Sequence, residues 1–235
     1  MISYTISSFV QKRTSNFLIF LLSVDMFFIL GHVLIALLWN FEPRQFMVDT
    51  DRGYPEIYQY GKFGFIIVLS IIMVLKRKEF GYLAWFVLFL FLMLDDAFQF
   101  HESAGAYLAD TLNLKPILGL RSRDWGELVY AGIGGLLFFG LLFIGLMRGS
   151  KIFRGECYDI LILFSVFLFF GIGVDMLHQW VVDIYMVSAV FALIEDGGEM
   201  IGLSLIAWYF YLITTNSRMG QPFLYQSFNF KKRKL

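Results

Sequence analysis

Charged residues are scarce in this chain, and the scarcity excludes an ordinary soluble domain. Of its 235 residues 16% are charged and 58% are hydrophobic, whereas about a quarter of a typical soluble domain is charged. The composition therefore predicts an all-α integral membrane protein. Cys157 is the only cysteine, so an internal disulfide is excluded. The basic clusters are short and adjoin apolar segments, so no nucleic-acid partner is expected.

Histidine is also rare, and its three copies exclude several membrane enzymes. His32, His101 and His178 cannot fill the many histidine boxes of membrane desaturases and hydroxylases. No HxxxH pair is present, so similarity to the zinc hydrolases of the ceramidase and adiponectin-receptor type is poor. No second histidine follows His101 at the spacing of the zinc metalloprotease motif.

Long apolar runs predict about six transmembrane helices in one domain, residues 1–235. About 20 apolar residues cross a bilayer core of about 30 Å. The first run is longer than the core of a signal peptide and lacks a small-x-small cleavage site, so we expect it to be retained. The second run is short, and its helix could begin in the preceding loop. The predicted spans are residues 16–39, 60–76, 81–101, 125–147, 158–181 and 187–213.

Lysine and arginine predict the orientation, because basic residues are enriched in cytoplasmic segments. Basic residues lie before the first span, between the second and third spans, between the fourth and fifth spans, and after the last span. This pattern predicts that both termini lie in the cytoplasm. The segments contain Lys12 and Arg13; Lys76, Arg77 and Lys78; Arg148, Lys151 and Arg154; and Lys231, Lys232, Arg233 and Lys234.

Acids and histidines gather at the other end of the predicted spans, in the extracytoplasmic half. A charge at mid-membrane costs on the order of 2.5–3.5 kcal/mol on the insertion scale, so intramembrane acids suggest function. If the third helix continues through Glu102, then Asp95, Gln99 and Glu102 fall nearly in line. No Lys or Arg lies inside a predicted span away from its ends. Arg121 and Arg123 could neutralise two acids at most, so protons, water or bound cations must balance the others.

Carboxylates with imidazoles are typical ligands of iron, manganese and zinc, and facing helices supply them in soluble dimetal bundles. We therefore predict two divalent ions, with iron favoured because carboxylates outnumber histidines, and zinc or manganese as alternatives. Asp25 and His32 could equally form a structural pair, and Glu127 could be a helix N-terminal charge. The predicted ligands are Asp96, His101, Glu102, Asp175, His178, Glu195 and Glu199; the bridging or outer candidates are Asp95, Glu127, Asp196, Asp25 and His32.

Glycines in the last three spans are predicted to allow close helix packing. Those near the acids should leave room beside the acidic face. The first group is Gly132, Gly134, Gly135, Gly140 and Gly145, and the second is Gly171, Gly198 and Gly202.

Three segments carry a resemblance to a set of proteins. They are VDTDRGYPEIYQYGK (48–62), LDDAFQFHE (94–102) and ALIEDGGEMIG (192–202). The chain resembles uncharacterised bacterial multi-pass membrane proteins that carry a Leu-Asp-Glu/Asp-x4-His-Glu motif and a late Glu-Glu/Asp-x-x-Glu motif. The resemblance supports these positions, implies a bacterial inner-membrane protein with the polar site facing the periplasm, and implies no reaction.

These observations predict a membrane-embedded metalloenzyme that oxidises or hydrolyses a lipid or another apolar small molecule. It would be a di-iron oxidase or oxygenase, or a zinc hydrolase. One alternative is a transporter of protons or divalent cations. Another is a non-catalytic subunit of a larger membrane complex. A protein partner or a second copy of the chain stays open for each of these functions.

Overall fold

The computed structural model describes residues 2–38, 44–117 and 119–215, and it contains no strand within these ranges. This confirms the all-α prediction. The elements are α1 (Ile2–Leu38), η1 (Arg44–Phe46), α2 (Tyr54–Arg77), α3 (Tyr82–Phe98), α4 (Phe100–Thr111), α5 (Ser122–Arg148), α6 (Lys151–Leu168), η2 (Phe169–Val174), α7 (Asp175–Gln179) and α8 (Tyr185–Thr215).

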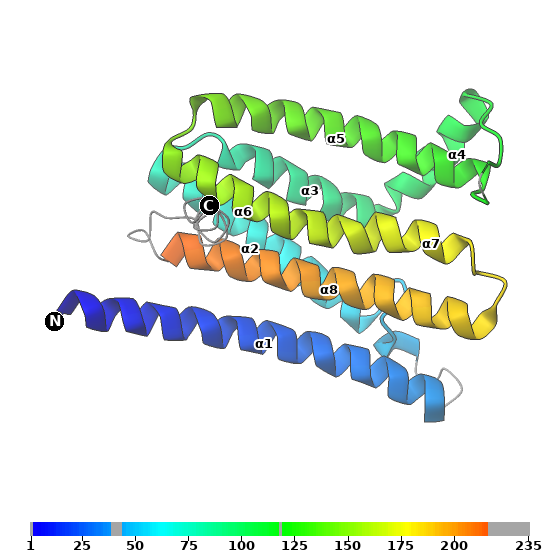
Figure 1. Cartoon of the computed structure of the whole chain (residues 1–235), viewed down its shortest axis with the longest axis horizontal. Coiled ribbons are helices and arrows are strands. Elements are labelled where there is room, and N and C mark those ends of the chain that lie inside the picture. Colours follow the sequence, from blue (N-terminus) through cyan, green and yellow to red (C-terminus); the bar gives the residue numbers. More distant parts are fainter. Residues whose placement is uncertain (1, 39–43, 118, 216–235) are drawn as a thin grey trace, which may run out of the picture.

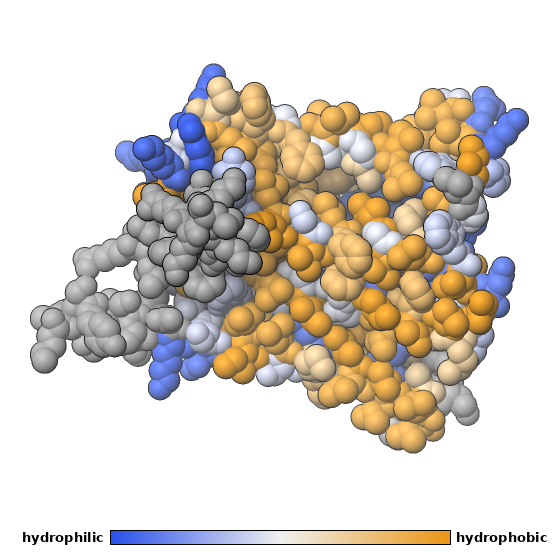
Figure 2. Space-filling model, viewed as in Figure 1, coloured by the Kyte–Doolittle hydropathy of each residue, from blue (hydrophilic) through white to orange (hydrophobic). Residues whose placement is uncertain are grey.

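The long helices run roughly side by side (Figure 1). Figure 2 shows apolar residues over the middle of this face and hydrophilic residues at its two ends. Four helices of the described chain are long and apolar enough to cross a membrane, or five if α3 and α4 form one bent span. They are residues 12–38, 54–77, 122–148 and 151–179; α8, which carries three acids, is not among them.

Several helices begin before the predicted spans. α2 begins at Tyr54, in the preceding loop, as the short second run allowed, whereas α6 begins at Lys151, before the predicted start at residue 158. Pro55 at the start of α2 explains the first difference, because proline is favoured in the first turn of a helix. The predicted end of the first span at Trp39 and the basic tail at 231–234 lie outside the described residues.

The third span was wrong in one respect, because the helix does not continue through Glu102. Gln99 adopts a left-handed conformation with φ 53°, which an L-residue rarely takes inside a helix. The axis turns by 81° between α3 and α4. Asp95 and Glu102 therefore lie on two different helices and do not share a face.

An aromatic core fills the middle of the bundle. The rings of Trp85 and Phe89 stack with centroids 6.1 Å apart, and Phe89 meets Phe210 edge to face at 5.9 Å. Buried polar groups lie beyond this core, toward the N-terminal end of α1. There Arg77 donates to both carboxylate oxygens of Glu156 at 2.8 and 2.7 Å. Ionisable groups thus occupy both ends of an apolar centre.

The glycines were partly misassigned. A methyl group at Gly132, Gly135 or Gly140 would meet nothing within 4 Å, so these residues do not mark close packing. The close helix approach is instead at Gly126 of α5, where an added carbon would overlap the carbonyl of Gly105 in α4. Gly145 approaches Gly81, as expected.

The other three glycines do bring α8 against α6 and η2. A carbon added at Gly171 would overlap the Glu199 carboxylate, and one at Gly198 would overlap the Phe170 ring. At Gly202 it would lie 3.1 Å from the Cα of Phe167. Close packing at these three glycines is confirmed, and at Gly171 the space is occupied by the Glu199 carboxylate.

Candidate functional site

Three carboxylates from two helices form the centre of the site. Asp96 lies near the end of α3, and Asp196 and Glu199 lie on α8. The charge of Glu199 interacts with that of Asp96, and the charge of Asp196 interacts with both. None of the three forms a hydrogen bond or ion pair with another described residue. We call these three residues the acidic cluster.

The π-helical segment η2 accommodates the deepest of these acids. Glu199 packs directly against Gly171 in the middle of η2. One-turn π segments occur frequently at functional sites, since they displace the backbone locally. Here the extra residue and the missing side chain together make room for a carboxylate between α6 and α8.

His101 lies beside the acidic cluster, and the carboxylate of Asp95 orients its ring. Its Nδ1 is 3.1 Å from Asp95 Oδ2, and Tyr130 of α5 donates a 2.9 Å hydrogen bond to Asp95 Oδ1. Both Asp96 and Glu199 interact electrostatically with the imidazole. A histidine whose second nitrogen is held by a carboxylate is the usual arrangement of a metal ligand.

His178 is held differently, with both ring nitrogens engaged. Nδ1 is 3.0 Å from Glu195 Oε2, and Nε2 is 2.8 Å from Ser188 Oγ. The ring of Phe191 stacks on the imidazole with centroids 6.4 Å apart. Asp175, the other predicted ligand of this segment, accepts a 3.3 Å hydrogen bond from Gln179.

Glu102 and Glu127 lie apart from the acidic cluster. Both form ion pairs with Arg123, and the Glu127 contact measures 2.8 Å. The side chains of Glu102 and Arg123 are 40% and 42% exposed, so this group faces the surface at the start of α5. Arg121 pairs with Asp124 at 2.9 Å. Neither arginine forms an ion pair with a member of the acidic cluster.

The expectation that no basic residue lies inside a span was wrong, because Asp25 pairs with a lysine of α2. Lys62, nine positions into α2, is buried and donates to Asp25 Oδ1 at 3.0 Å. It also donates to the Met200 carbonyl at 2.8 Å and to Ser204 at 3.2 Å. In the predicted span 60–76, Lys62 lay at the end, so its burial was not expected. Asp25 is a partner of Lys62 and does not pair with His32.

His32 lies in a small structural contact at the end of α1. Its Nδ1 accepts a 3.2 Å hydrogen bond from the Val48 amide and is 3.7 Å from Asp49. The ring is buried. This contact joins α1 to the segment before α2.

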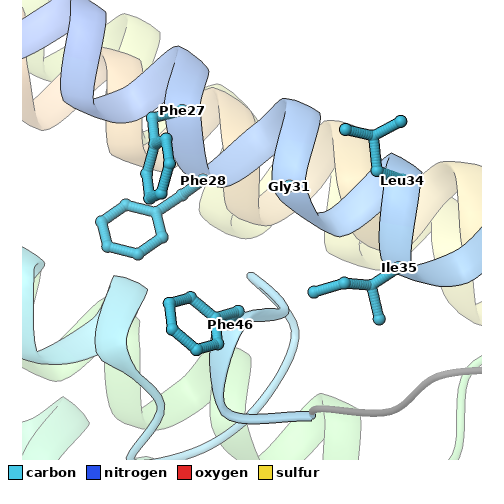
Figure 3. Close-up of a pocket in the computed structure, with 6 residues that line it drawn as sticks. All are labelled: Phe27, Phe28, Gly31, Leu34, Ile35 and Phe46. Carbon is cyan, nitrogen blue, oxygen red and sulfur yellow. The ribbon is translucent and has the colours of Figure 1, made fainter. Parts of the chain in front are cut away.

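The described residues also form an apolar pocket of about 210 Å³ between α1 and η1 (Figure 3). Its lining contains no titratable side chain, so no acid, base or metal ligand faces the pocket. The lining residues are Phe27, Phe28, Gly31, Leu34, Ile35 and Phe46.

Metal binding stays a prediction. Among the described residues, no three histidine, cysteine, aspartate or glutamate side chains are arranged to hold a metal ion as they stand. The acidic cluster and His101 interact electrostatically and have no ion pair with a lysine or arginine in the described part of the chain, and Glu195, which is held by His178, interacts with Asp196 and Glu199 as well. A cation would have to draw these groups together by rotation of their side chains.

Three residues that contact sequence-predicted candidates were not predicted themselves: Tyr130 binds Asp95, Ser188 binds His178 and Lys62 binds Asp25. Tyr130 and Ser188 gave no signal, because a single tyrosine or serine in an apolar helix is ordinary. Lys62 did give a signal, because it lies eight residues after Tyr54 and would therefore be inside any helix that begins at Tyr54.

Comparison with known proteins gives a family and little more. No curated protein and no solved structure matches the chain. Residues 52–215, which include α2 to α8 and therefore the acidic cluster, match a family model. The chain belongs to the family described as "Domain of unknown function (DUF8692)".

Proposed function

We propose that this protein is a membrane-embedded metalloenzyme that crosses the bilayer six times, with both termini in the cytoplasm. A divalent metal, iron in preference to zinc or manganese, binds the acidic cluster and His101. The substrate is a lipid or another apolar molecule.

The observation that carries this proposal is the unbalanced charge of the acidic cluster. The nearby basic side chains have other partners: Lys62 is bound to Asp25, and Arg123 is bound to Glu102 and Glu127. Each intramembrane carboxylate is costly without a positive partner. A bound cation would remove this cost, and carboxylates with an imidazole suit a metal of intermediate hardness.

The surroundings of the cluster favour catalysis over transport. Leu203, Ile206 and Phe210 follow Glu199 along α8, and all three are fully buried. They belong to the aromatic core, which closes the bundle on the side of the cluster toward the N-terminal end of α1. A site with one open side can exchange substrate and product but gives an ion no exit across the membrane.

Metal analysis of the purified full-length chain tests the proposal. We expect wild-type protein to retain iron, zinc or manganese after dialysis, and Asp96→Asn or Glu199→Gln to weaken binding at least about tenfold. Glu102→Gln is the matched control, because its carboxylate pairs with Arg123 at the surface. Wild-type protein without stoichiometric metal after reconstitution, or equal loss in the control, would refute the proposal.

A second candidate is proton conduction, which one observation favours. Polar groups recur along α8 beyond Glu199, at Ser204 and at Tyr209, where the hydroxyl donates to Asp159 at 2.7 Å. At 1.5 Å per residue, these groups span about 15 Å of the helix. Proton flux in proteoliposomes that Glu199→Gln abolishes and metal chelation does not would favour this function.

A further inference from the structure

Ser188, His178 and Glu195 are arranged as a nucleophile, a base and an orienting acid. Ser188 Oγ is 2.8 Å from His178 Nε2, and His178 Nδ1 is 3.0 Å from Glu195 Oε2. Both distances fall in the range that active serine hydrolases use. From this geometry we infer a second site, a Ser188–His178–Glu195 triad that transfers acyl groups from apolar esters. It does not depend on the metal proposed above.

The hydrogen-bond directions fit these roles. When Glu195 is ionised it can only accept, so it then fixes the proton of His178 on Nδ1. Nε2 then carries a lone pair and accepts from the Ser188 hydroxyl, which is the tautomer that a general base requires. Stacking of Phe191 on the imidazole holds the plane of the ring.

The local fold gives the triad rigid supports. His178 lies on α7, and both Ser188 and Glu195 lie on α8, seven residues and therefore about two turns apart. The chain reverses direction between the two helices, so one side chain of α7 reaches two positions on the same face of α8. Ser188 lies at the start of α8, where the helix dipole is positive and favours a developing oxyanion.

The substrate class follows from the surface around the serine. Ser188 is half-buried, and the reversal before it presents large apolar side chains to the surroundings. In a chain with membrane-spanning helices, such a surface contacts acyl chains. The triad would therefore act on a carboxylic ester of a long-chain acyl group. The exposed side chains are Trp180, Val182, Ile184, Tyr185, Met186 and Val187.

The reaction balances with water as the second substrate. Ser188 Oγ forms a bond to the acyl carbon while its proton passes to His178 Nε2. The bond from the acyl carbon to the alcohol oxygen breaks, and that oxygen takes the proton from His178. Water then repeats the sequence on the acyl-serine, releasing the fatty acid and restoring the serine hydroxyl.

A long-chain alkyl fluorophosphonate tests the triad directly on the full-length protein in lipid nanodiscs. Attack by Ser188 forms an Oγ–P bond and expels fluoride. We expect labelling that mass spectrometry maps to Ser188. The labelling rate should fall at least about 100-fold in Ser188→Ala, His178→Gln and Glu195→Gln.

Two control variants should label like wild type. Ser165→Ala removes a serine whose hydroxyl only donates to the Leu161 carbonyl at 2.7 Å, and Glu102→Gln removes an acid held by Arg123. Circular dichroism verifies that each variant is folded. If wild-type protein is unlabelled, or its label maps to another residue, the triad is refuted even where a variant misfolds.

A chelator separates this inference from the metal site. Labelling that survives EDTA supports a serine mechanism, whatever the metal analysis finds. Labelling that EDTA abolishes in wild-type protein would overturn the independent triad. Absence of bound metal together with labelled Ser188 would refute the proposed metalloenzyme and leave the triad standing.

Discussion

Replacing Lys62 by methionine should greatly destabilise the bundle. The Lys62 and Asp25 side chains are 2% and 0% exposed, and their charged atoms lie 3.0 Å apart. At that distance the Coulomb attraction is about 5–6 kcal/mol with an effective dielectric constant of 20. Removing one partner leaves a buried charge uncompensated, so we expect Lys62→Met to lower the free energy of unfolding by about 3–5 kcal/mol.

The measurement is reversible unfolding of the purified protein in mixed micelles with increasing SDS, followed by circular dichroism. The double variant Asp25→Leu/Lys62→Met removes both charges and should cost less than Lys62→Met alone, because apolar replacement of a buried pair is often nearly neutral. Lys76→Met, at an exposed position in the same helix, should change stability by less than about 0.5 kcal/mol. If Lys62→Met lies within 1 kcal/mol of wild type (~0.7 of a decade in the folding constant), the pair does not hold α1 as described.

Three further changes test other contacts. Gly171→Ala should displace the Glu199 carboxylate and lower metal retention, while Gly132→Ala, which meets open space, should not; metal analysis compares the two. Arg77→Met breaks a partly buried pair with an α6 carboxylate and should lower the free energy of unfolding by about 2–4 kcal/mol, measured in the same SDS titration; a change below 1 kcal/mol (~0.7 of a decade) would contradict it. Lys78→Gly should raise stability by about 0.5–1 kcal/mol, since Lys78 is exposed with φ 54° and glycine adopts this conformation without strain; a lower unfolding midpoint would contradict that reasoning.

The sequence predicted the helices well because apolar length is a strong signal. It predicted their ends poorly, since the polar first turns of α2 and α6 read as loop. The break at Gln99 was missed because a glutamine carries no propensity for a left-handed bend. In the structure Gln99 donates a 2.9 Å hydrogen bond to Asp51, a contact with a distant segment that the local sequence does not indicate.

The candidate site was predictable in part. Asp96, Asp196 and Glu199 were predicted as site candidates because a carboxylate inside an apolar helix costs free energy, and this is evident from the sequence alone. Which groups pair could not be predicted, since pairing depends on helix rotation and on the bend after α3. Glu102 illustrates this point: on a continuous helix it would face Asp95, but on α4 it meets Arg123.

The partnership of Asp25 and Lys62 bears on how the polypeptide enters the membrane. The two residues lie on successive helices, and Asp25 precedes the family region, which begins at residue 52. If the helices were inserted one at a time, each would bring one unpaired charge into the hydrocarbon, at a free-energy cost on the order of 2.5–3.5 kcal/mol per charge. Inserted together as a hairpin, the two helices would bring a neutral ion pair into the membrane, so joint insertion is favoured over insertion one helix at a time.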